Sequence, residues 1–238
     1  MSEAMMNKTM KAVVCEKSGP DGYAQFRDFP RPEKAVGHEV LIDTKNMSLN
    51  FPDPLQIQGL YQFQPPVPFV LGMEFSGIVR DVGDKVTRFK VGDRVVSLGM
   101  GAFAEQNKAE EQYCFALPDD ISFEQGCLAP LAAGTALYGL KYRGSLVAGE
   151  TVAVTGAAGG TGLAAVQLAK ALGATVIAIC SSKEKCDLAS RVGADHALNY
   201  TELDISEEVK SLTGGKGVDV VYDTVGGELF DKLSRRMA

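Results

Sequence analysis

Hydrophobic and polar positions alternate with a short period in the first half of the chain. Four short runs with this pattern are separated by Gly, Pro and Asp residues; they cover positions 11–15, 39–44, 75–79 and 94–97. Alternation with a period of two between frequent turn residues is typical of β-strands. The pattern predicts a β-rich domain over residues 1–130.

The pattern changes near residue 122. Positions 123–140 have a helical period, and after residue 150 short apolar strands alternate with amphipathic helices. The expected strands are 151–155, 175–180, 194–198 and 218–222. The expected helices are 161–172, 183–192, 205–212 and one that begins near residue 228. Such alternation predicts a parallel sheet covered by helices, in a second domain over residues 131–238.

The end of the pattern leads to a further expectation. A doubly wound dinucleotide-binding domain usually has about six strands, and only four are expected here. We therefore expect an incomplete domain whose fourth strand has an unpaired edge, in a fragment, a splice form or a truncated gene product. At the other end, Met10 begins a strand-like run and is an alternative to Met1 as the working start.

Composition narrows the classes of partner. The formal net charge is -6, which argues against nucleic-acid binding because such binding depends on clustered Lys and Arg. There is no polybasic segment and no apolar run of the ~18 residues that cross a membrane. The five cysteines are scattered, without a CxxC pair, as in proteins of reducing compartments. We expect a cytoplasmic protein with neither a nucleic-acid nor a membrane partner.

A glycine-rich turn carries the strongest chemical signal. It follows the expected strand 151–155 and opens the expected helix 161–172. Glycines allow a close approach to a pyrophosphate, and the helix N-terminus offers free N–H groups with a partial positive charge. The alternative is an ordinary tight turn between a strand and a helix. The candidate cofactor-binding residues here are Ala158, Gly159, Gly160, Thr161 and Gly162.

The residues after the second expected strand indicate which dinucleotide binds. An NAD site usually has an acid at this point, but Ser181 and Ser182 stand here, with Lys185 shortly after. Hydroxyl and ammonium groups suit a 2′-phosphate, and one charge-assisted hydrogen bond favours NADP(H) by roughly ten- to hundredfold. The alternative is that Lys183 and Lys185 are only solvent-exposed residues in the first turn of a helix, without a ligand.

Several motifs along the chain also match a known pattern. They are Gly72-Met73-Glu74-Phe75-Ser76-Gly77, Lys170-Ala171-Leu172-Gly173-Ala174, Gly193-Ala194, Asn199-Tyr200 and Val221-Tyr222-Asp223-Thr224-Val225-Gly226-Gly227. With them, residues 10–237 resemble quinone oxidoreductases of the zeta-crystallin type, a zinc-free branch of the medium-chain dehydrogenase/reductase family.

The resemblance implies a fold and roles for several residues. It implies a GroES-like β-rich domain followed by a Rossmann domain, with Lys185 and Tyr200 gripping the 2′-phosphate of NADP(H). It also implies that Thr135 and Thr224 lie beside the nicotinamide end. The family tends to form homodimers through an edge strand that this chain lacks.

A catalytic zinc is not expected. Zinc-dependent relatives in the same superfamily bind the metal through Cys and a Gly-His-Glu motif. The corresponding positions hold Asn50 and Met73, which are not usual zinc ligands, and the two histidines, His38 and His196, lie elsewhere. We therefore predict no metal site.

Without zinc, reduction of a conjugated acceptor is the expected chemistry. Hydride from NADPH would reach a quinone or an enone, whose oxygen then needs a hydrogen-bond donor and a proton. The candidates are Tyr61 and Asn50. Alternatively, Tyr61 packs on Pro65 and Pro66, and Asn50 caps a turn. Two other functions stay open: an enoyl-thioester reductase, or a non-catalytic NADPH-binding or scaffold protein, which a truncated C-terminus would favour.

Overall fold

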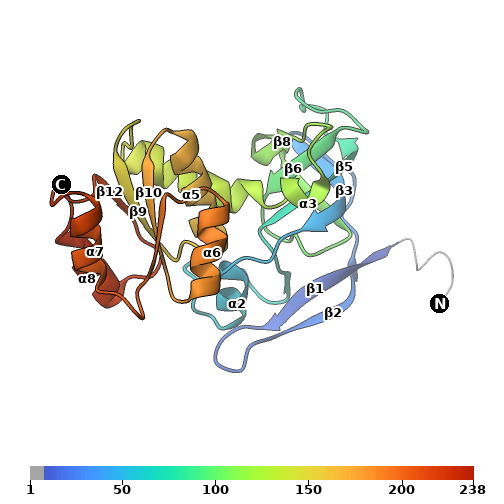
Figure 1. Ribbon diagram of the computed structural model, residues 1–238. Helices are drawn as coiled ribbons and strands as arrows, with labels where there is room; N and C mark the ends of the chain where they lie inside the picture. The colour runs from blue at the N-terminus through green and yellow to red at the C-terminus, as the bar shows by residue number, and fades with distance from the viewer. Residues whose placement is uncertain (1–7) are drawn as a thin grey trace. The chain divides into compact units, whose positions relative to one another are not determined.

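A computed structural model describes residues 8–238 (Figure 1). The chain divides into two compact units, one up to Leu131 and the other from Ala132. Each unit has its own sheets and its own apolar core.

The first unit contains two antiparallel sheets. The smaller sheet has the order β2-β1-β4, with β1 at Thr9–Lys17, β2 at Tyr23–Pro30 and β4 at Phe69–Val70. The larger has the order β7-β3-β5-β6-β8, formed by β3 (Glu39–Met47), β5 (Glu74–Val82), β6 (Arg94–Leu98), β7 (Gln106–Glu110) and β8 (Cys114–Ala116). Short helices complete the unit: α2 (Pro52–Ile57), η1 (Glu111–Tyr113) and α3 (Phe123–Gly126).

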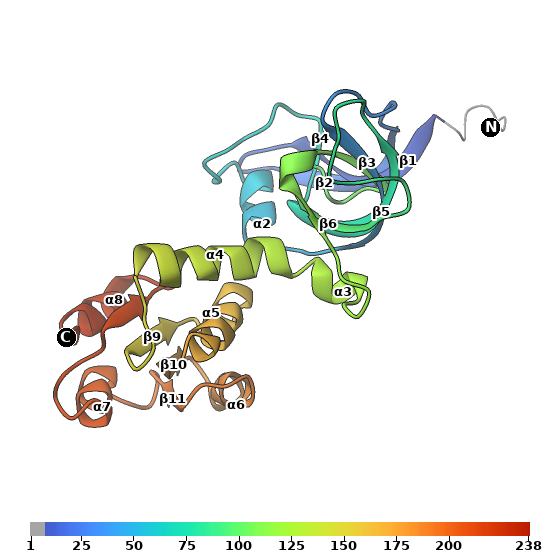
Figure 2. The ribbon, with the colours of Figure 1, turned by 90° about the horizontal axis from the view of Figure 1, so that it is seen from above.

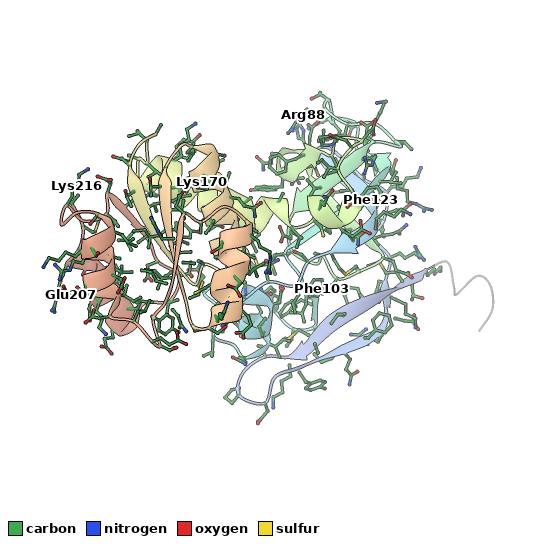
Figure 3. All side chains as sticks on the ribbon, viewed as in Figure 1. Arg88, Phe103, Phe123, Lys170, Glu207 and Lys216 are labelled. Atoms are coloured by element: carbon green, nitrogen blue, oxygen red, sulfur yellow. The ribbon has the colours of Figure 1, made fainter. Side chains whose placement is uncertain are left out.

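Alternating apolar residues build the core of the first unit. Val40 and Ile42 on β3, with Phe75 and Val79 on β5, are almost fully buried, as expected for one inward face of a pleated sheet. Phe103, labelled in Figure 3, belongs to this core, and its carbonyl accepts the Val13 N–H of β1 at 2.9 Å.

The second unit is a four-stranded parallel sheet with helices on both faces. The strand order is β11-β10-β9-β12, with β9 at Thr151–Thr155, β10 at Thr175–Cys180, β11 at His196–Asn199 and β12 at Val220–Tyr222. The helices that follow the four strands are α5 (Gly160–Ala171), α6 (Lys183–Arg191), α7 (Ile205–Leu212) and α8 (Gly227–Ser234). Before β9 run η2 (Ala129–Ala133), α4 (Gly134–Leu137) and η3 (Tyr138–Arg143).

The strand side chains of this unit are apolar on both faces, as helices on each side require. Val152 and Val154 pack with α4, α5 and α6, whereas Ala153 packs with α7 and α8. Figures 1 and 2 show the helices on the two sides of the sheet. No helix within residues 8–238 is long and apolar enough to cross a membrane.

The observed elements differ from the predicted ones in several places. The third and fourth strands of the parallel sheet begin two residues later than predicted, and larger differences concern residues 123–140 and the segment before β12. Residues 123–140 form no single helix, because α3 ends at Gly126 and η2 and η3 are wide π-type turns. Pro130 lacks the N–H that a regular helix needs at that point. Within residues 8–238 the strand β12 pairs with β9 and with no other strand, as expected, but residues 236–238 lie beside the segment before β12: Val218 N–H donates to Arg236 O at 2.8 Å.

Candidate cofactor and reaction site

The glycine turn connects β9 to α5. Gly156 has φ +57°, which is unfavourable for residues with a Cβ, and Gly159 precedes the first turn of α5. The free N–H groups of this 12-residue helix therefore begin at the turn, where they and the helix dipole favour an anion. Gly162 is buried against the turn: a Cβ there would lie 2.1 Å from Gly156 O. Its role is close helix–turn packing.

Basic and hydroxyl side chains follow the carboxyl end of β10. Lys185 Nζ donates to Ser181 Oγ at 2.8 Å, and the Ser182 hydroxyl caps α6 by accepting the Lys185 N–H. Lys183 instead pairs with Asp187 on its own helix, at 2.9 Å. Lys183 therefore fits the alternative interpretation, a solvent-exposed lysine at the start of a helix. Lys185 does not, because among residues 8–238 it forms no ion pair with an acid.

Tyr200 follows the end of β11. Its N–H donates to Cys180 O at 3.0 Å, which holds it next to the end of β10. Asn199 Oδ1 accepts the N–H and the hydroxyl of Thr201 at 3.1 and 2.9 Å, which forms the turn. Tyr200 is 39% exposed and lines the cavity described below.

Asp223 organises the turn after β12. Its Oδ1 accepts the Thr155 hydroxyl at 2.5 Å, and its Oδ2 accepts the Gly226 N–H at 3.0 Å. The Thr224 N–H in turn donates to Thr155 Oγ1 at 2.9 Å. These bonds join the carboxyl ends of β9 and β12 and fix Thr224.

Together these segments surround a cavity of about 360 Å³. It is lined by Gly156, Ala158, Gly159, Ile179, Cys180, Ser181, Lys185, Tyr200, Thr224 and Val225. Six of the predicted cofactor-binding residues are in this lining: Ala158, Gly159, Ser181, Lys185, Tyr200 and Thr224. Four are not. Gly160, Thr161 and Gly162 form the start of α5, and Thr135 is an exposed residue on α4.

The lining is suited to an anion. Lys185 supplies a positive charge, and none of the lining residues is an acid. Burial, with a smaller contribution from the neighbouring Cys186, raises the pKa of the Cys180 thiol to about 11, so this group is neutral. The prediction missed Gly156, Ile179, Cys180 and Val225. They lie at or just after the carboxyl ends of parallel strands, where ligands of α/β proteins commonly bind, and that rule could have identified them.

Asn50 lies in a buried polar network of the first unit. Its side-chain nitrogen donates to Ser48 Oγ and to Glu74 Oε1, both at 2.9 Å. Its backbone N–H donates to Asp53 Oδ2 at 2.6 Å. At this turn the main chain of Asn50 is held by the Asp53 carboxylate, and the side chain of Asn50 bonds to Ser48 and Glu74 instead.

The two acids of this network have different surroundings. Glu74 is 1% exposed, and its Oε2 accepts the Leu131 N–H at 2.8 Å. Asp53 is equally buried, but its Oδ1 has no hydrogen-bond partner, and the same is true of Gln56 Oε1. Burial, followed by the nearby charge of Glu74, raises the pKa of the Asp53 carboxyl.

Tyr61 follows α2 and is half-buried. Its N–H donates to Leu55 O at 3.3 Å, and its carbonyl accepts the Gln64 side chain at 3.1 Å. Within the part of the chain that the structure describes, the Tyr61 hydroxyl forms no hydrogen bond. It therefore has an O–H available for a ligand.

The positions that correspond to the zinc ligands of zinc-dependent relatives are occupied by residues that are not usual zinc ligands. Asn50 is engaged with Glu74, and Met73 has a thioether in place of an imidazole. Across residues 8–238, no three His, Cys, Asp or Glu side chains are grouped so that they could hold a metal ion. His38 lies 3.9 Å from Glu111, and His196 begins β11.

Two family patterns match the chain. Residues 37–133 match the alcohol dehydrogenase GroES-like domain, and residues 160–237 match the family described as zinc-binding dehydrogenase. The GroES-like match covers most of the first unit, and the other covers most of the parallel sheet and its helices.

Individual proteins are similar over nearly the whole chain. Quinone oxidoreductase-like protein 2 of Bos taurus is 41% identical over 211 residues, which are 88% of this chain and 60% of that protein. A quinone oxidoreductase of Pseudomonas aeruginosa is 40% identical over 90% of this chain and 65% of its own length. The chain thus spans less than two thirds of the length of these relatives.

A solved structure with the same fold has been determined with a bound cofactor. The crystal structure of Escherichia coli quinone oxidoreductase complexed with NADPH has a TM-score of 0.87 and 35% identity, covering 96% of this chain and 70% of that one. With these matches and the two-unit fold, the chain belongs to the quinone oxidoreductase branch of the medium-chain dehydrogenase/reductase superfamily.

Proposed function

We propose that the chain binds NADPH in the cavity at the carboxyl ends of β9, β10 and β12 and serves hydride transfer to a quinone or another α,β-unsaturated carbonyl compound. The observation that carries the proposal is the group formed by Lys185, Ser181 and Tyr200 beside the glycine turn, without a carboxylate in the lining. The complex of the E. coli relative with NADPH supports the choice of cofactor.

The residues of the cavity fit the charged parts of NADPH. Lys185 and the hydroxyls of Ser181 and Tyr200 are suitable partners for the adenosine 2′-phosphate. The N-terminus of α5, which follows Gly159, suits the pyrophosphate. Thr224, which is hydrogen-bonded to Thr155, lines the cavity at the carboxyl end of β12. NADH lacks the 2′-phosphate, so it would not form the charge-assisted hydrogen bond with Lys185.

The bound cofactor would supply a hydride to the electron-poor carbon of a conjugated acceptor. The protein must then stabilise negative charge on the acceptor's oxygen and deliver a proton. We assign this task to the hydroxyl of Tyr61, whose O–H has no partner within residues 8–238. Asn50 is the second residue that we assign to the reaction.

The test is a titration of the purified 238-residue chain with NADPH and with NADH, followed by the fluorescence of the cofactor. We expect saturable binding of NADPH and at least tenfold weaker binding of NADH, because one charge-assisted hydrogen bond contributes ~1.5–3 kcal/mol. A folded, monodisperse chain that binds neither cofactor would refute the proposal and would favour a non-catalytic role.

The acceptor class is tested next, by the loss of NADPH absorbance with three compounds. A naphthoquinone, a simple enone and an enoyl thioester represent the possible substrates. Turnover of the quinone or the enone supports the proposal, whereas turnover of the thioester alone would make the chain an enoyl-thioester reductase.

A further inference from the structure

Two carboxylates join the neighbouring strands β9 and β12, one at each end of the pair (Figure 1). At the amino ends, Asp219 Oδ2 accepts the Thr151 N–H at 2.8 Å. At the carboxyl ends, Asp223 Oδ1 accepts the Thr155 hydroxyl at 2.5 Å. The two pairs bridge the same strands with the same separation of 68 residues in the chain, but only the second pair lies at the end of the sheet where the cavity is.

The Thr155 hydroxyl both donates and accepts a hydrogen bond. Thr155 is fully buried; its O–H donates to Asp223, and its Oγ1 accepts the Thr224 N–H at 2.9 Å. The Thr224 hydroxyl in turn donates to the Thr155 carbonyl at 3.1 Å. Because a carboxylate can only accept, Asp223 decides where the Thr155 O–H points and leaves the lone pairs of this oxygen to the Thr224 N–H. Thr224 is therefore held by two hydrogen bonds to Thr155.

The position of Thr224 limits where the glycine turn can lie. Gly156 begins this turn, and a Cβ at Gly156 would lie 2.5 Å from Thr224 Oγ1. The Thr224 hydroxyl thus occupies the space that a side chain at position 156 would need. If Thr224 moved away from β9, the turn would lose this packing contact. Asp223 therefore acts on the glycine turn through Thr155 and Thr224.

The same carboxylate also holds the residues that follow Thr224. Asp223 Oδ2 accepts the Gly226 N–H at 3.0 Å, and Asp223 Oδ1 accepts the Val225 N–H at 3.3 Å. Val225 lines the cavity together with Gly156 and Thr224. Asp223 itself is not a lining residue, so its contribution to the cavity is made through these neighbours.

The other part of the lining lies at the ends of β10 and β11. Ser181, Lys185 and Tyr200 belong to it, and they are fixed by different contacts: Lys185 bonds to Ser181, and the Tyr200 N–H bonds to Cys180. In the strand order β11-β10-β9-β12, the strand β9 separates this part from β12. A ligand anchored at Lys185 reaches Thr224 only if it extends across the end of β9.

We propose that Asp223 is a positioning residue for the part of the cavity formed by Gly156, Thr224 and Val225. In this proposal, that part holds the segment of the dinucleotide that lies beyond the adenosine 2′-phosphate. The inference rests on the proposed function for the identity of the ligand. Its signature is selective: loss of the Asp223 carboxylate weakens binding of the whole dinucleotide and leaves binding of adenosine 2′-monophosphate, which ends at the Lys185 side, unchanged.

Asp223→Asn is the test variant. Whichever way the new amide turns, its NH₂ group meets a backbone donor, either the Val225 N–H or the Gly226 N–H, so at least one hydrogen bond is lost. We expect the Kd for NADPH, measured by the fluorescence of the cofactor, to rise roughly fivefold or more. The Kd for adenosine 2′-monophosphate, measured by NMR titration of the ¹⁵N-labelled chain, should change by less than about twofold.

Asp219→Asn is the matched control. It replaces a carboxylate that joins the same two strands, at the end away from the cavity. It should lower the midpoint of urea unfolding, as Asp223→Asn does, because both variants weaken the connection between β9 and β12. Both Kd values should nevertheless stay within about twofold of those of the unmodified chain.

Two variants of Thr155 keep the test decisive if Asp223→Asn does not fold. Thr155→Val keeps the shape of the side chain without the hydroxyl, and it should raise the Kd for NADPH as Asp223→Asn does. Thr155→Ser keeps the hydroxyl and should bind NADPH within about twofold of the unmodified chain. If Thr155 served packing alone, serine would be the more harmful change, because it leaves a buried gap of one methyl group.

Three results would overturn the proposal while the proposed function stands. They are equal rises of the Kd for NADPH in Asp223→Asn and Asp219→Asn, equal weakening of NADPH and adenosine 2′-monophosphate, and an unchanged Kd for NADPH in the folded Asp223→Asn chain. If the unmodified chain binds neither ligand, the proposed function fails. Amide hydrogen exchange then still decides whether Asp223 holds Thr224: the Thr224 N–H should exchange roughly tenfold faster in Asp223→Asn than in Asp219→Asn, and equal rates would refute it.

Discussion

A methyl group at position 162 would test how closely α5 must approach the turn after β9. In Gly162→Ala the new Cβ would lie 2.1 Å from Gly156 O and 2.8 Å from Ala157 Cα. Real Cβ atoms essentially never lie closer than 3.0 Å to such atoms, so the helix or the turn must move by roughly 1 Å. Overpacking of this kind costs ~1–3 kcal/mol of the free energy of unfolding.

The neighbouring Gly160 provides a matched control. It is the first residue of α5, and a Cβ there would meet no atom within 4 Å. Because alanine is favoured over glycine in a helix by up to ~1 kcal/mol, Gly160→Ala should leave the stability unchanged or raise it slightly.

The comparison is made by urea unfolding of the three chains, followed by circular dichroism. We expect a lower midpoint for Gly162→Ala at an unchanged slope, and a midpoint for Gly160→Ala at or above that of the unmodified chain. The Kd for NADPH should rise in Gly162→Ala, because the displaced turn carries Ala158 and Gly159. Equal stability of the two variants, within ~0.5 kcal/mol, would refute the close-packing argument.

Three further changes test the charged and polar groups. Lys185→Ala should raise the Kd for NADPH roughly ten- to hundredfold and leave that for NADH unchanged, whereas Lys183→Ala should change neither. Tyr61→Phe should lower kcat for a quinone roughly a hundredfold at an unchanged Kd for NADPH. The raised pKa of Asp53 means that folding favours its protonated form; its contribution to stability is complete below the ordinary Asp pKa and is lost as pH rises through the raised value. Asp53→Asn should remove this decline, because an amide does not ionise in this range, so the variant should be at least as stable at neutral pH.

Each of these changes has an outcome that would contradict its reasoning. Equal losses of NADPH and NADH affinity in Lys185→Ala would mean that the lysine does not recognise the 2′-phosphate. Normal turnover by Tyr61→Phe would remove Tyr61 from the reaction. The prediction for Asp53→Asn is tested by urea unfolding between pH 4 and pH 8. If the free energy of unfolding declines with pH in this variant as much as in the unmodified chain, another group titrates.

Local motifs were the most predictable part of the molecule. The glycine turn, Ser181 and Lys185 are each fixed by the strand and helix next to them in sequence, so the order of residues was enough to place them in one lining. Tyr200 could be placed there by resemblance only, because its position depends on a hydrogen bond to Cys180, at the end of another strand.

Long-range contacts could not be predicted in this way. Asp223 and Thr155 are 68 residues apart, and only the pairing of β12 with β9 brings them together. The direction of the Asn50 amide likewise depends on Glu74, 24 residues later, at the start of β5. The sequence marked Asn50 as a possible donor because asparagine has both a donor and an acceptor, and the choice between them is made by its neighbours.

The burial of the cysteines has a consequence for chemical durability. Quinones and enones are soft electrophiles that alkylate thiolates, so a protein that handles them risks inactivation by its own substrates. All five cysteines are buried, and burial raises the pKa of each thiol. For Cys180, with a pKa of about 11, only ~10⁻⁴ of the thiol is ionised at neutral pH. A sulfur atom can therefore line the cavity and still be a poor nucleophile toward a soft electrophile.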